Sequence, residues 1–344
     1  MVYEQYYEDF GYPMTGKKLQ QLKDFLKEEA LDYDEGIEFT VNLCDRKGDI
    51  AATGSIEGST LKCIAVSEKF QGEGLAARIV SVIVSEASSM GRTHLMLFTK
   101  PENTHIFKDL GFYLISETKG AALMENQKNG IASYVRSLKP ETDYDETGAI
   151  VLNCNPFTCG HLYLAEEASR SCDFLHLFVV SEDRSIFPAA ARYELVKKGV
   201  EHLKNVAVHQ TSDYLISSAT FPTYFLKDKF KAGEINCILD LTIFCDYFVK
   251  ILGITKRFVG TEPFDKVTAS YNEQMKDILQ RRGIRVVEVE RYQKEGHVVS
   301  ASWVRQLMAQ KDYEEIKKIV PKTTYDFLLS EEGQKIAGEI RNSM

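Results

Sequence analysis

One short stretch near the middle of the chain, Gly148 to Tyr163, limits most strongly what the chain can fold into. It begins with an apolar run, Ala149 to Leu152, which is long enough for one buried strand. Asn155 and Pro156 then mark a tight turn, and the residues after His161 have the composition of a helix. A strand, a turn and a helix N-terminus in this order predict an anion-binding site, because the first amides of a helix have no partner inside it.

The turn carries residues suited to holding a phosphate. Gly160 has no side chain where a phosphate would approach the backbone, and Thr158 and His161 can donate hydrogen bonds beside it. A simpler interpretation makes Thr158 a plain helix N-cap and Gly160-His161 an ordinary first turn. The longer string NPFTCGH resembles the T/HxGH signature of the nucleotidyltransferase superfamily, with Thr158 as a variant of its first position. The resemblance implies nucleotide contacts from Asn155, Phe157, Thr158, Gly160 and His161.

A second motif, SASWVR at residues 300–305, resembles the other signature of the superfamily, ISSTxIR. There the hydroxyls and the arginine hold the outer phosphates from the side opposite the T/HxGH turn. The resemblance therefore assigns nucleotide contacts to Ser300, Ser302 and Arg305, whereas Trp303 departs from the signature. A serine N-cap before an amphipathic helix is the simpler interpretation, and we expect that helix in either case.

The first 135 residues or so have another organisation. A helical pattern at 15–30 precedes strand-like runs at 38–44, 49–55 and 61–66 and a further helix from Leu75. The string QGEGLA before that helix resembles the Q/R-x-x-G-x-G/A signature of the GCN5-related acetyltransferases, and NTHIFKDLGF at 103–112 resembles a later segment of that family. The resemblance implies that the loop amides hold the pyrophosphate of a coenzyme A-type group, with contacts from Gln71, Gly72, Gly74 and Ala76. A plain turn is the alternative.

The length of 344 residues fits two domains. We predict an α/β protein with a GCN5-related acetyltransferase-like domain at 1–138, an acidic linker at 139–147, and a nucleotidyltransferase-like domain at 148–344. In the last part strand-like runs alternate with helical ones, which predicts a Rossmann-like parallel sheet wrapped by helices. Ligands on such sheets bind at the carboxyl ends of strands, where NPFTCGH falls.

Composition narrows the classes of function. A net charge of −8 argues against a nucleic-acid partner, and no apolar run approaches the ~20 residues that cross a bilayer. The N-terminus lacks the pattern of a signal peptide, and the seven cysteines include no CxxC pair. The histidines show no metal-ligand spacing. We therefore expect a cytoplasmic protein with reduced thiols, no membrane partner and no metal held by its own side chains.

Two longer strings extend the resemblance over nearly the whole chain. YLISSATFPTYF at 214–225 and RFVGTEPFDKVTASYN at 257–272, together with the domain order, resemble the citrate lyase ligase family. The resemblance implies an AMP-forming ligase that uses ATP, Mg²⁺ carried mainly by ATP, and acetate. Acetyl-adenylate then acetylates the thiol of a dephospho-coenzyme A-type arm on the acyl carrier subunit of citrate lyase, which activates the lyase. His161, Thr158 and Arg305 would be catalytic.

Several alternatives stay open at this point. One is a bifunctional protein that joins an adenylyltransferase to a coenzyme A-dependent acetyltransferase, and another is a sensor that binds nucleotide without turnover. The arm could be bound by the N-terminal domain, since it carries the pantetheine and pyrophosphate of coenzyme A. The acetate pocket is not defined, with Phe157, Tyr224 and Phe264 as candidates, and His297 has no assigned role.

Overall fold

The computed structural model describes residues 5–181, 185–215, 221–226, 231–262 and 266–343. These residues form two compact units. The first contains Met1–Gly130 and Phe221–Leu239, and the second contains Ile131–Thr220 and Asp240–Met344. The division follows packing, and the domain limits expected from the sequence, at residues 138 and 148, stay predictions.

The first unit is built on a seven-stranded sheet with the order β1-β2-β3-β4-β5-β7-β6. Neighbouring strands are antiparallel except β4 and β5, which are parallel and share only two paired positions, Thr60 with Met96 and Leu61 with Leu97. Beyond these positions the two strands part. The elements are β1 (Tyr7–Gly11), α1 (Gly16–Glu28), β2 (Phe39–Cys44), β3 (Ile50–Glu57), β4 (Thr60–Val66), α2 (Leu75–Ser89), β5 (Met96–Thr99), α3 (Thr104–Asp109), β6 (Tyr113–Glu117) and β7 (Ala122–Glu125), with short 3₁₀ turns at Glu68–Phe70 and Pro101–Asn103.

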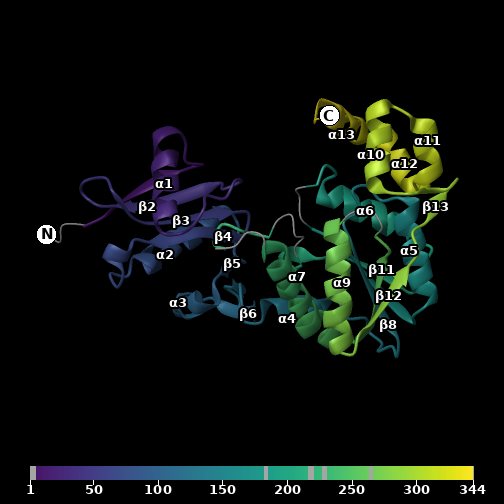
Figure 1. Ribbon diagram of the computed structural model, residues 1–344, viewed down its shortest axis with the longest axis horizontal. Helices are drawn as coiled ribbons and strands as arrows, with labels where there is room; N and C mark the ends of the chain where they lie inside the picture. The colour runs from purple at the N-terminus through teal and green to yellow at the C-terminus, as the bar shows by residue number, and fades with distance from the viewer. Residues whose placement is uncertain (1–4, 182–184, 216–220, 227–230, 263–265, 344) are drawn as a thin grey trace. The chain divides into compact units, whose positions relative to one another are not determined.

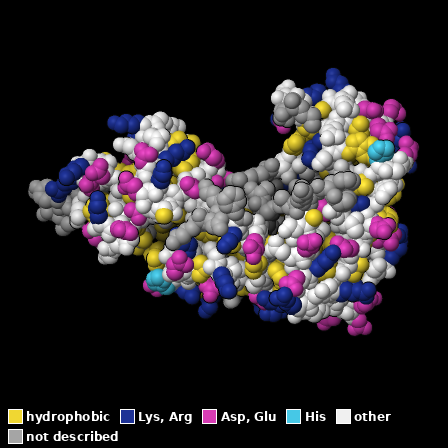
Figure 2. Space-filling model, viewed as in Figure 1, with side chains coloured by type: hydrophobic (Ala, Val, Ile, Leu, Met, Phe, Trp, Pro, Cys, Tyr) yellow, Lys and Arg dark blue, Asp and Glu magenta, His cyan; other side chains and the backbone are white. Residues whose placement is uncertain are grey.

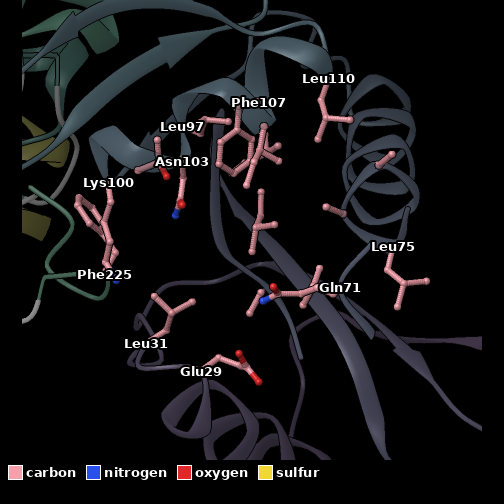
Figure 3. A pocket seen from close by; sticks show the side chains of 18 of the residues that line it. Glu29, Leu31, Gln71, Leu75, Leu97, Lys100, Asn103, Phe107, Leu110 and Phe225 are labelled. Atoms are coloured by element: carbon pink, nitrogen blue, oxygen red, sulfur yellow. The ribbon is translucent and has the colours of Figure 1, made fainter. Parts of the chain in front are cut away.

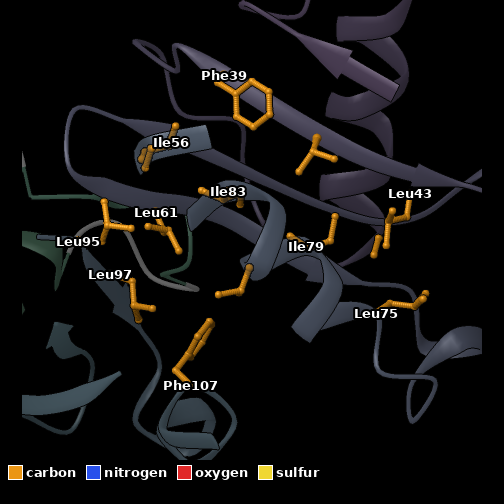
Figure 4. Packing of buried hydrophobic residues seen from close by; sticks show 14 of the residues in the cluster. Phe39, Leu43, Ile56, Leu61, Leu75, Ile79, Ile83, Leu95, Leu97 and Phe107 are labelled. Atoms are coloured by element: carbon orange, nitrogen blue, oxygen red, sulfur yellow. The ribbon is translucent and has the colours of Figure 1, made fainter. Parts of the chain in front are cut away.

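The core of this unit forms where α2 packs on the sheet (Figures 1 and 4). Ile79 and Ile83 of α2 are fully buried against β3. They come so close to Gly54 that a Cβ there would lie 2.4 Å from Ile79 and 2.7 Å from Ile83. Glycine at this position therefore lets the helix approach the sheet, and the apolar spacing of α2 supplies the buried face.

The second unit contains a parallel five-stranded sheet with the order β10-β9-β8-β11-β12. The chain starts in the middle, at β8, moves outward through β9 and β10, and returns to the other side of β8 for β11 and β12. The elements are α4 (Gly130–Ser137), β8 (Thr147–Leu152), α5 (Cys159–Arg170), β9 (Phe174–Val179), α6 (Ala189–Gly199), β10 (Val206–Gln210), β11 (Ile254–Gly260), α9 (Lys266–Arg281) and β12 (Arg285–Val289). The prediction of a Rossmann-like parallel α/β sheet is confirmed.

Helices cover both faces of this sheet. Leu177 and Val179 pack with α5 and α6, whereas Phe178 faces the opposite side and meets Phe248 with ring centroids 5.4 Å apart. The helix on that side runs through α7 (Ala232–Ile243), a π-helical stretch (Phe244–Val249) and α8 (Lys250–Leu252). The first residues of α7 belong to the first unit, and its last residues belong to the second.

Four further helices follow the sheet and pack together through a core of their own (Figure 1). A short hairpin, β13 (Gln293–Lys294) and β14 (His297–Val298), leads into α10 (Ala301–Gln310), α11 (Tyr313–Ile319), α12 (Lys322–Leu329) and α13 (Glu331–Ser343). Val304, Leu307 and Met308 form the buried face of α10, which confirms the amphipathic helix expected after Ser300.

Candidate nucleotide site and the cavity of the first unit

The turn after β8 lies at the switch point of the parallel sheet. Strand β8 pairs with β9 on one side and β11 on the other, and the chain leaves its carboxyl end through residues 153–158 into α5. Parallel α/β sheets bind ligands at this place, because the loops on either side of the switch run in opposite directions and leave a crevice.

Thr158 and His161 form a reciprocal cap at the start of α5. The Thr158 hydroxyl accepts a hydrogen bond from the amide of His161 at 3.4 Å, and His161 Nδ1 accepts from the amide of Thr158 at 3.1 Å. The N-cap interpretation is therefore right for Thr158, and the same contacts fix the imidazole. Because Nδ1 is an acceptor here, the proton of the neutral ring lies on Nε2, which becomes the donor.

His161 is neutral at physiological pH. Burial disfavours its cation, and the positive charge of Arg291 adds to this, so its pKa falls from 6.5 to about 4. Phe157, which is fully buried, lies against the ring at a centroid distance of 6.0 Å. The side chain of Phe157 also fills the space left by Gly199 of α6, where a Cβ would come within 2.4 Å of it. Phe157 is thus a core residue that supports the imidazole.

Gly160 brings the two sequence motifs together. A Cβ at this position would lie 2.9 Å from the carbonyl oxygen of Val299, the residue just before Ser300. The absence of a side chain is therefore required by neighbouring backbone, a constraint that the sequence alone did not reveal. It allows the segment that starts α10 to pack directly against the first turn of α5.

The second motif meets the turn through its arginine. Arg305 donates from Nη1 to the carbonyl of Asn155 and from Nη2 to Ser302 Oγ at 3.2 Å. Ser300 Oγ accepts from the amide of Trp303 at 3.1 Å, so it caps α10. Burial lowers the pKa of Arg305 from its ordinary value of 12.5, but the guanidinium stays charged at neutral pH. The two motifs thus bring together the Arg305 guanidinium, the His161 imidazole and two helix N-termini.

Two arginines of the site were not found from the sequence. Arg192, fully buried on α6, donates to the carbonyls of Phe187, Asn153 and Val180 at 2.7 to 2.9 Å. It holds the ends of β8 and β9 together. Arg291 donates from Nε to the carbonyl of Thr261 at 2.6 Å and pairs with the Glu262 carboxylate. Neither lies in a recognisable motif, because each acts through backbone contacts that only the fold creates.

Other side chains near the turn have structural contacts or are exposed. Asn155 Oδ1 accepts from the amide of Phe187 at 3.0 Å, so its side chain braces a neighbouring segment. His297 is exposed, with its ring 5.9 Å from that of Trp303. Burial raises the pKa of both Cys154 and Cys159, to about 11 for Cys159, so neither thiol is ionised at neutral pH. Phe264, a candidate for the acetate pocket, lies outside the described residues.

The first unit has a cavity of about 770 Å³ (Figure 3). Gln71, Gly72, Gly74 and Ala76 all line it, so the fold brings together the residues predicted to bind the arm. Gly72 and Gly74 have positive φ angles of 88° and 75°, which favour glycine. Gly74 is also the N-cap of α2 and makes no side-chain cap, so the first amides of the helix remain available for an anion.

Tyr224 lines the same cavity, although the sequence predicts a separate domain for residues 148–344. Tyr224 and Phe225 line it, although they follow β10 in the chain. Tyr224 was a candidate for the acetate pocket of the nucleotide domain, and the structure puts it in the first unit. The amide of Asp32 donates to the carbonyl of Tyr224 at 2.9 Å, and the rings of Phe98 and Phe221 meet at 5.6 Å. These contacts hold residues 221–226 against the sheet.

Comparison with known proteins decides the family. The family described as "Citrate lyase ligase C-terminal domain" matches residues 147–328. The "[Citrate [pro-3S]-lyase] ligase" of Haemophilus influenzae is 40% identical over 319 residues, which cover 91% of this chain and 95% of that protein. The chain belongs to the citrate lyase ligase family. The Escherichia coli protein of the same name is also 40% identical, over 91% of this chain and 90% of its own length.

Members of the citrate lyase ligase family are enzymes, and the fold agrees with this membership. The chain has two α/β units, and the second contains the parallel sheet that the sequence predicted. A putative acyl-CoA N-acyltransferase from Klebsiella pneumoniae covers 35% of this chain and 95% of its own length, with 14% identity and a TM-score of 0.30.

Proposed function

We propose that this chain is an ATP-dependent, AMP-forming ligase that acetylates the thiol of a dephospho-coenzyme A-type arm on the acyl carrier subunit of citrate lyase. The observation that carries the proposal is the direct contact between the two motifs in this member of the citrate lyase ligase family. Gly160 packs on the carbonyl of Val299, and Arg305 contacts the carbonyl of Asn155. The donors of both motifs therefore converge on the carboxyl end of β8.

The first step joins acetate to ATP. A carboxylate oxygen of acetate attacks the α-phosphorus, the bond from that phosphorus to the bridging oxygen breaks, and pyrophosphate leaves with the electron pair. Negative charge grows on the departing phosphates, and donors fixed before the reaction stabilise it best. We assign this role to His161 Nε2–H, the amides at the start of α5, Arg305, and the N-terminus of α10. The neutral imidazole acts as a donor and need not titrate.

The second step transfers the acetyl group. The thiol sulfur of the arm attacks the acetyl carbon, AMP leaves with the electron pair of the broken bond, and the thiol proton passes to solvent. No protein nucleophile is required, which agrees with the un-ionised thiols of Cys154 and Cys159. The arm would lie in the cavity of the first unit, with its diphosphate at Gly72 and Gly74 and its tail along the apolar wall.

The groups around the α5 turn suit phosphate better than a metal ion. They are amides, a hydroxyl, an imidazole and a guanidinium, and within the described ranges no three His, Cys, Asp or Glu residues gather to hold a metal. Mg²⁺ would therefore arrive with ATP and neutralise its phosphates. No helix in the described parts of the chain is long and apolar enough to cross a membrane. We infer a cytoplasmic enzyme, where ATP and reduced thiols are abundant.

One assay tests the function. Purified protein is supplied with ATP, acetate and dephospho-coenzyme A, and AMP and thioester are measured. We expect both products in equal amounts and only when acetate is present. The bifunctional alternative, which family membership does not favour, would instead need acetyl-coenzyme A. A nucleotide sensor would bind ATP without forming AMP. If His161→Ala left acetate-dependent exchange of pyrophosphate into ATP unchanged, the assignment of the nucleotide site would be wrong.

A second variant tests the division of labour between the two units. Gly74→Asp introduces a carboxylate at a left-handed position beside the amides that would hold the diphosphate. We expect this variant to lose most acetylation of the arm while keeping acetate-dependent pyrophosphate exchange, because the exchange needs only the nucleotide site. An equal loss of both reactions in a folded variant would show that the cavity has another role.

A further inference from the structure

One end of the cavity of the first unit has backbone amides that can bind an anion. Gly72, Gly74 and the free amides of α2 lie at that end. Apolar side chains of β4, β5 and α3 form the wall, and Phe225 and Lys100 lie on the side opposite Gln71 and Leu75 (Figure 3). A long ligand with a diphosphate at one end would therefore extend its uncharged tail toward residues 224–225.

Tyr224 is placed where β4 and β5 part. The strands stop pairing after Leu61 and Leu97. The Tyr224 hydroxyl donates to the carbonyl of Phe98 on β5 at 3.4 Å. The phenol of Tyr224 is thus tied to β5, while the Tyr224 backbone is linked through Asp32 to Cys63 of β4.

The local backbone of β4 is shaped for this contact. Cys63 has a φ of 52°, and the β3–β4 pairing shifts register opposite Gly54, which marks a β-bulge. Left-handed conformations cost energy outside glycine and persist where the surroundings hold them. Here the Cys63 thiol donates to the carbonyl of Asp32 at 3.6 Å, and the amide of Asp32 holds the Tyr224 carbonyl. Three segments far apart in sequence fix one tyrosine.

The phenol itself stays protonated. Tyr224 is 7% exposed, and burial raises its pKa well above the ordinary value of 10.0. Its hydroxyl is therefore a donor toward Phe98, and no proton transfer through it is needed. The tyrosine contributes a fixed aromatic side chain to the lining of the cavity, next in the chain to Phe225.

We propose that Tyr224 closes the gap between β4 and β5 and limits the acyl group of a bound thioester to acetyl size. The inference rests on the proposed binding of the arm in this cavity and adds a residue that selects its acyl chain. A hydrophobic wall discriminates by about 10–200-fold for each methylene. Removing the ring should open the gap to a longer chain, whereas Tyr224→Phe keeps the wall.

The test measures binding of dephospho-coenzyme A, acetyl-dephospho-coenzyme A and butyryl-dephospho-coenzyme A by calorimetry. Wild type and Tyr224→Phe should prefer the acetyl over the butyryl thioester by at least tenfold. Tyr224→Ala should reduce this preference at least tenfold while still binding the free thiol. Tyr113→Ala, which removes an exposed tyrosine of the same unit outside the cavity, is the matched control and should keep the wild-type preference.

Two outcomes overturn the inference in distinguishable ways. If wild type binds none of the three thiol compounds, the proposed arm site fails and the inference fails with it. If wild type binds them but Tyr224→Ala keeps the same preference for acetyl and a cooperative thermal transition, the arm site stands and Tyr224 is not the selecting residue.

Discussion

Replacing Gly160 with alanine separates the two explanations for this glycine. In a plain first helical turn, alanine would stabilise the protein by up to ~1 kcal/mol, because it restricts the unfolded chain more than glycine does. In this structure the new Cβ would lie 2.9 Å from the carbonyl of Val299. Ordinary contacts of this kind begin near 3.4 Å, so the α5 turn and the segment before α10 must move apart by roughly half an ångström.

That movement should affect catalysis more than stability. Overpacking typically costs about 1–3 kcal/mol, and a misplacement near 1 Å can cost 10²-fold in rate. We expect Gly160→Ala to lose about 1–2 kcal/mol of unfolding free energy and roughly 10- to 100-fold in acetate-dependent pyrophosphate exchange.

The control is a helical glycine whose surroundings leave room for a Cβ. Gly338 lies in α13, where a Cβ would meet only the end of the Arg341 side chain at 3.9 Å. Gly338→Ala should therefore raise stability slightly and leave exchange unchanged. Unfolding in urea and the exchange rate are measured for both variants. A Gly160→Ala protein that is more stable and fully active would refute the close approach of the two motifs.

Two further predictions concern buried charge and buried imidazole. Arg192→Met leaves the carbonyls of Phe187, Asn153 and Val180 without this donor, so we expect a loss of about 3–5 kcal/mol in urea unfolding; a loss below ~1 kcal/mol would contradict its bracing role. Burial lowers the pKa of His161, His176 and His209 from 6.5 to about 4, 3 and 4. The unfolded chain therefore binds protons below about pH 6.5 that the folded chain does not, and stability should fall as the pH drops from 6.5 toward 4. Urea unfolding at pH 7.5 and 5 checks this, and a His176→Phe/His209→Phe variant should show a weaker dependence; equal stability of wild type at both pH values would contradict it.

The mixed charge of the surface also bears on partners. On the face shown in Figure 2, Lys and Arg side chains lie among Asp and Glu on each unit, without a continuous basic area. On this face, therefore, neither unit offers a partner a continuous basic surface.

Local sequence determined the elements and the kind of chemistry. The apolar run before Leu152, the turn and the helix after Thr158 are consecutive in the chain, so their order alone predicts a strand, a phosphate turn and a helix. Val206–Gln210 and Arg285–Val289 form strands in the part of the chain where alternating strand-like and helical runs predicted a parallel sheet. Periodicity and capping act over a few residues, and they can be read without knowing the fold.

Only the tertiary structure decided which distant groups meet. Gly160 packs against the carbonyl of Val299, and Arg192 donates to carbonyls that precede it by up to 39 residues. The Tyr224 hydroxyl donates to the carbonyl of Phe98, more than 120 residues before it. Each of these contacts has a backbone carbonyl as one partner, and carbonyls are the same in every residue, so the sequence does not show which of them a distant residue will meet. The sequence therefore predicts the two turns as candidate phosphate sites, whereas the contacts around them arise from tertiary packing.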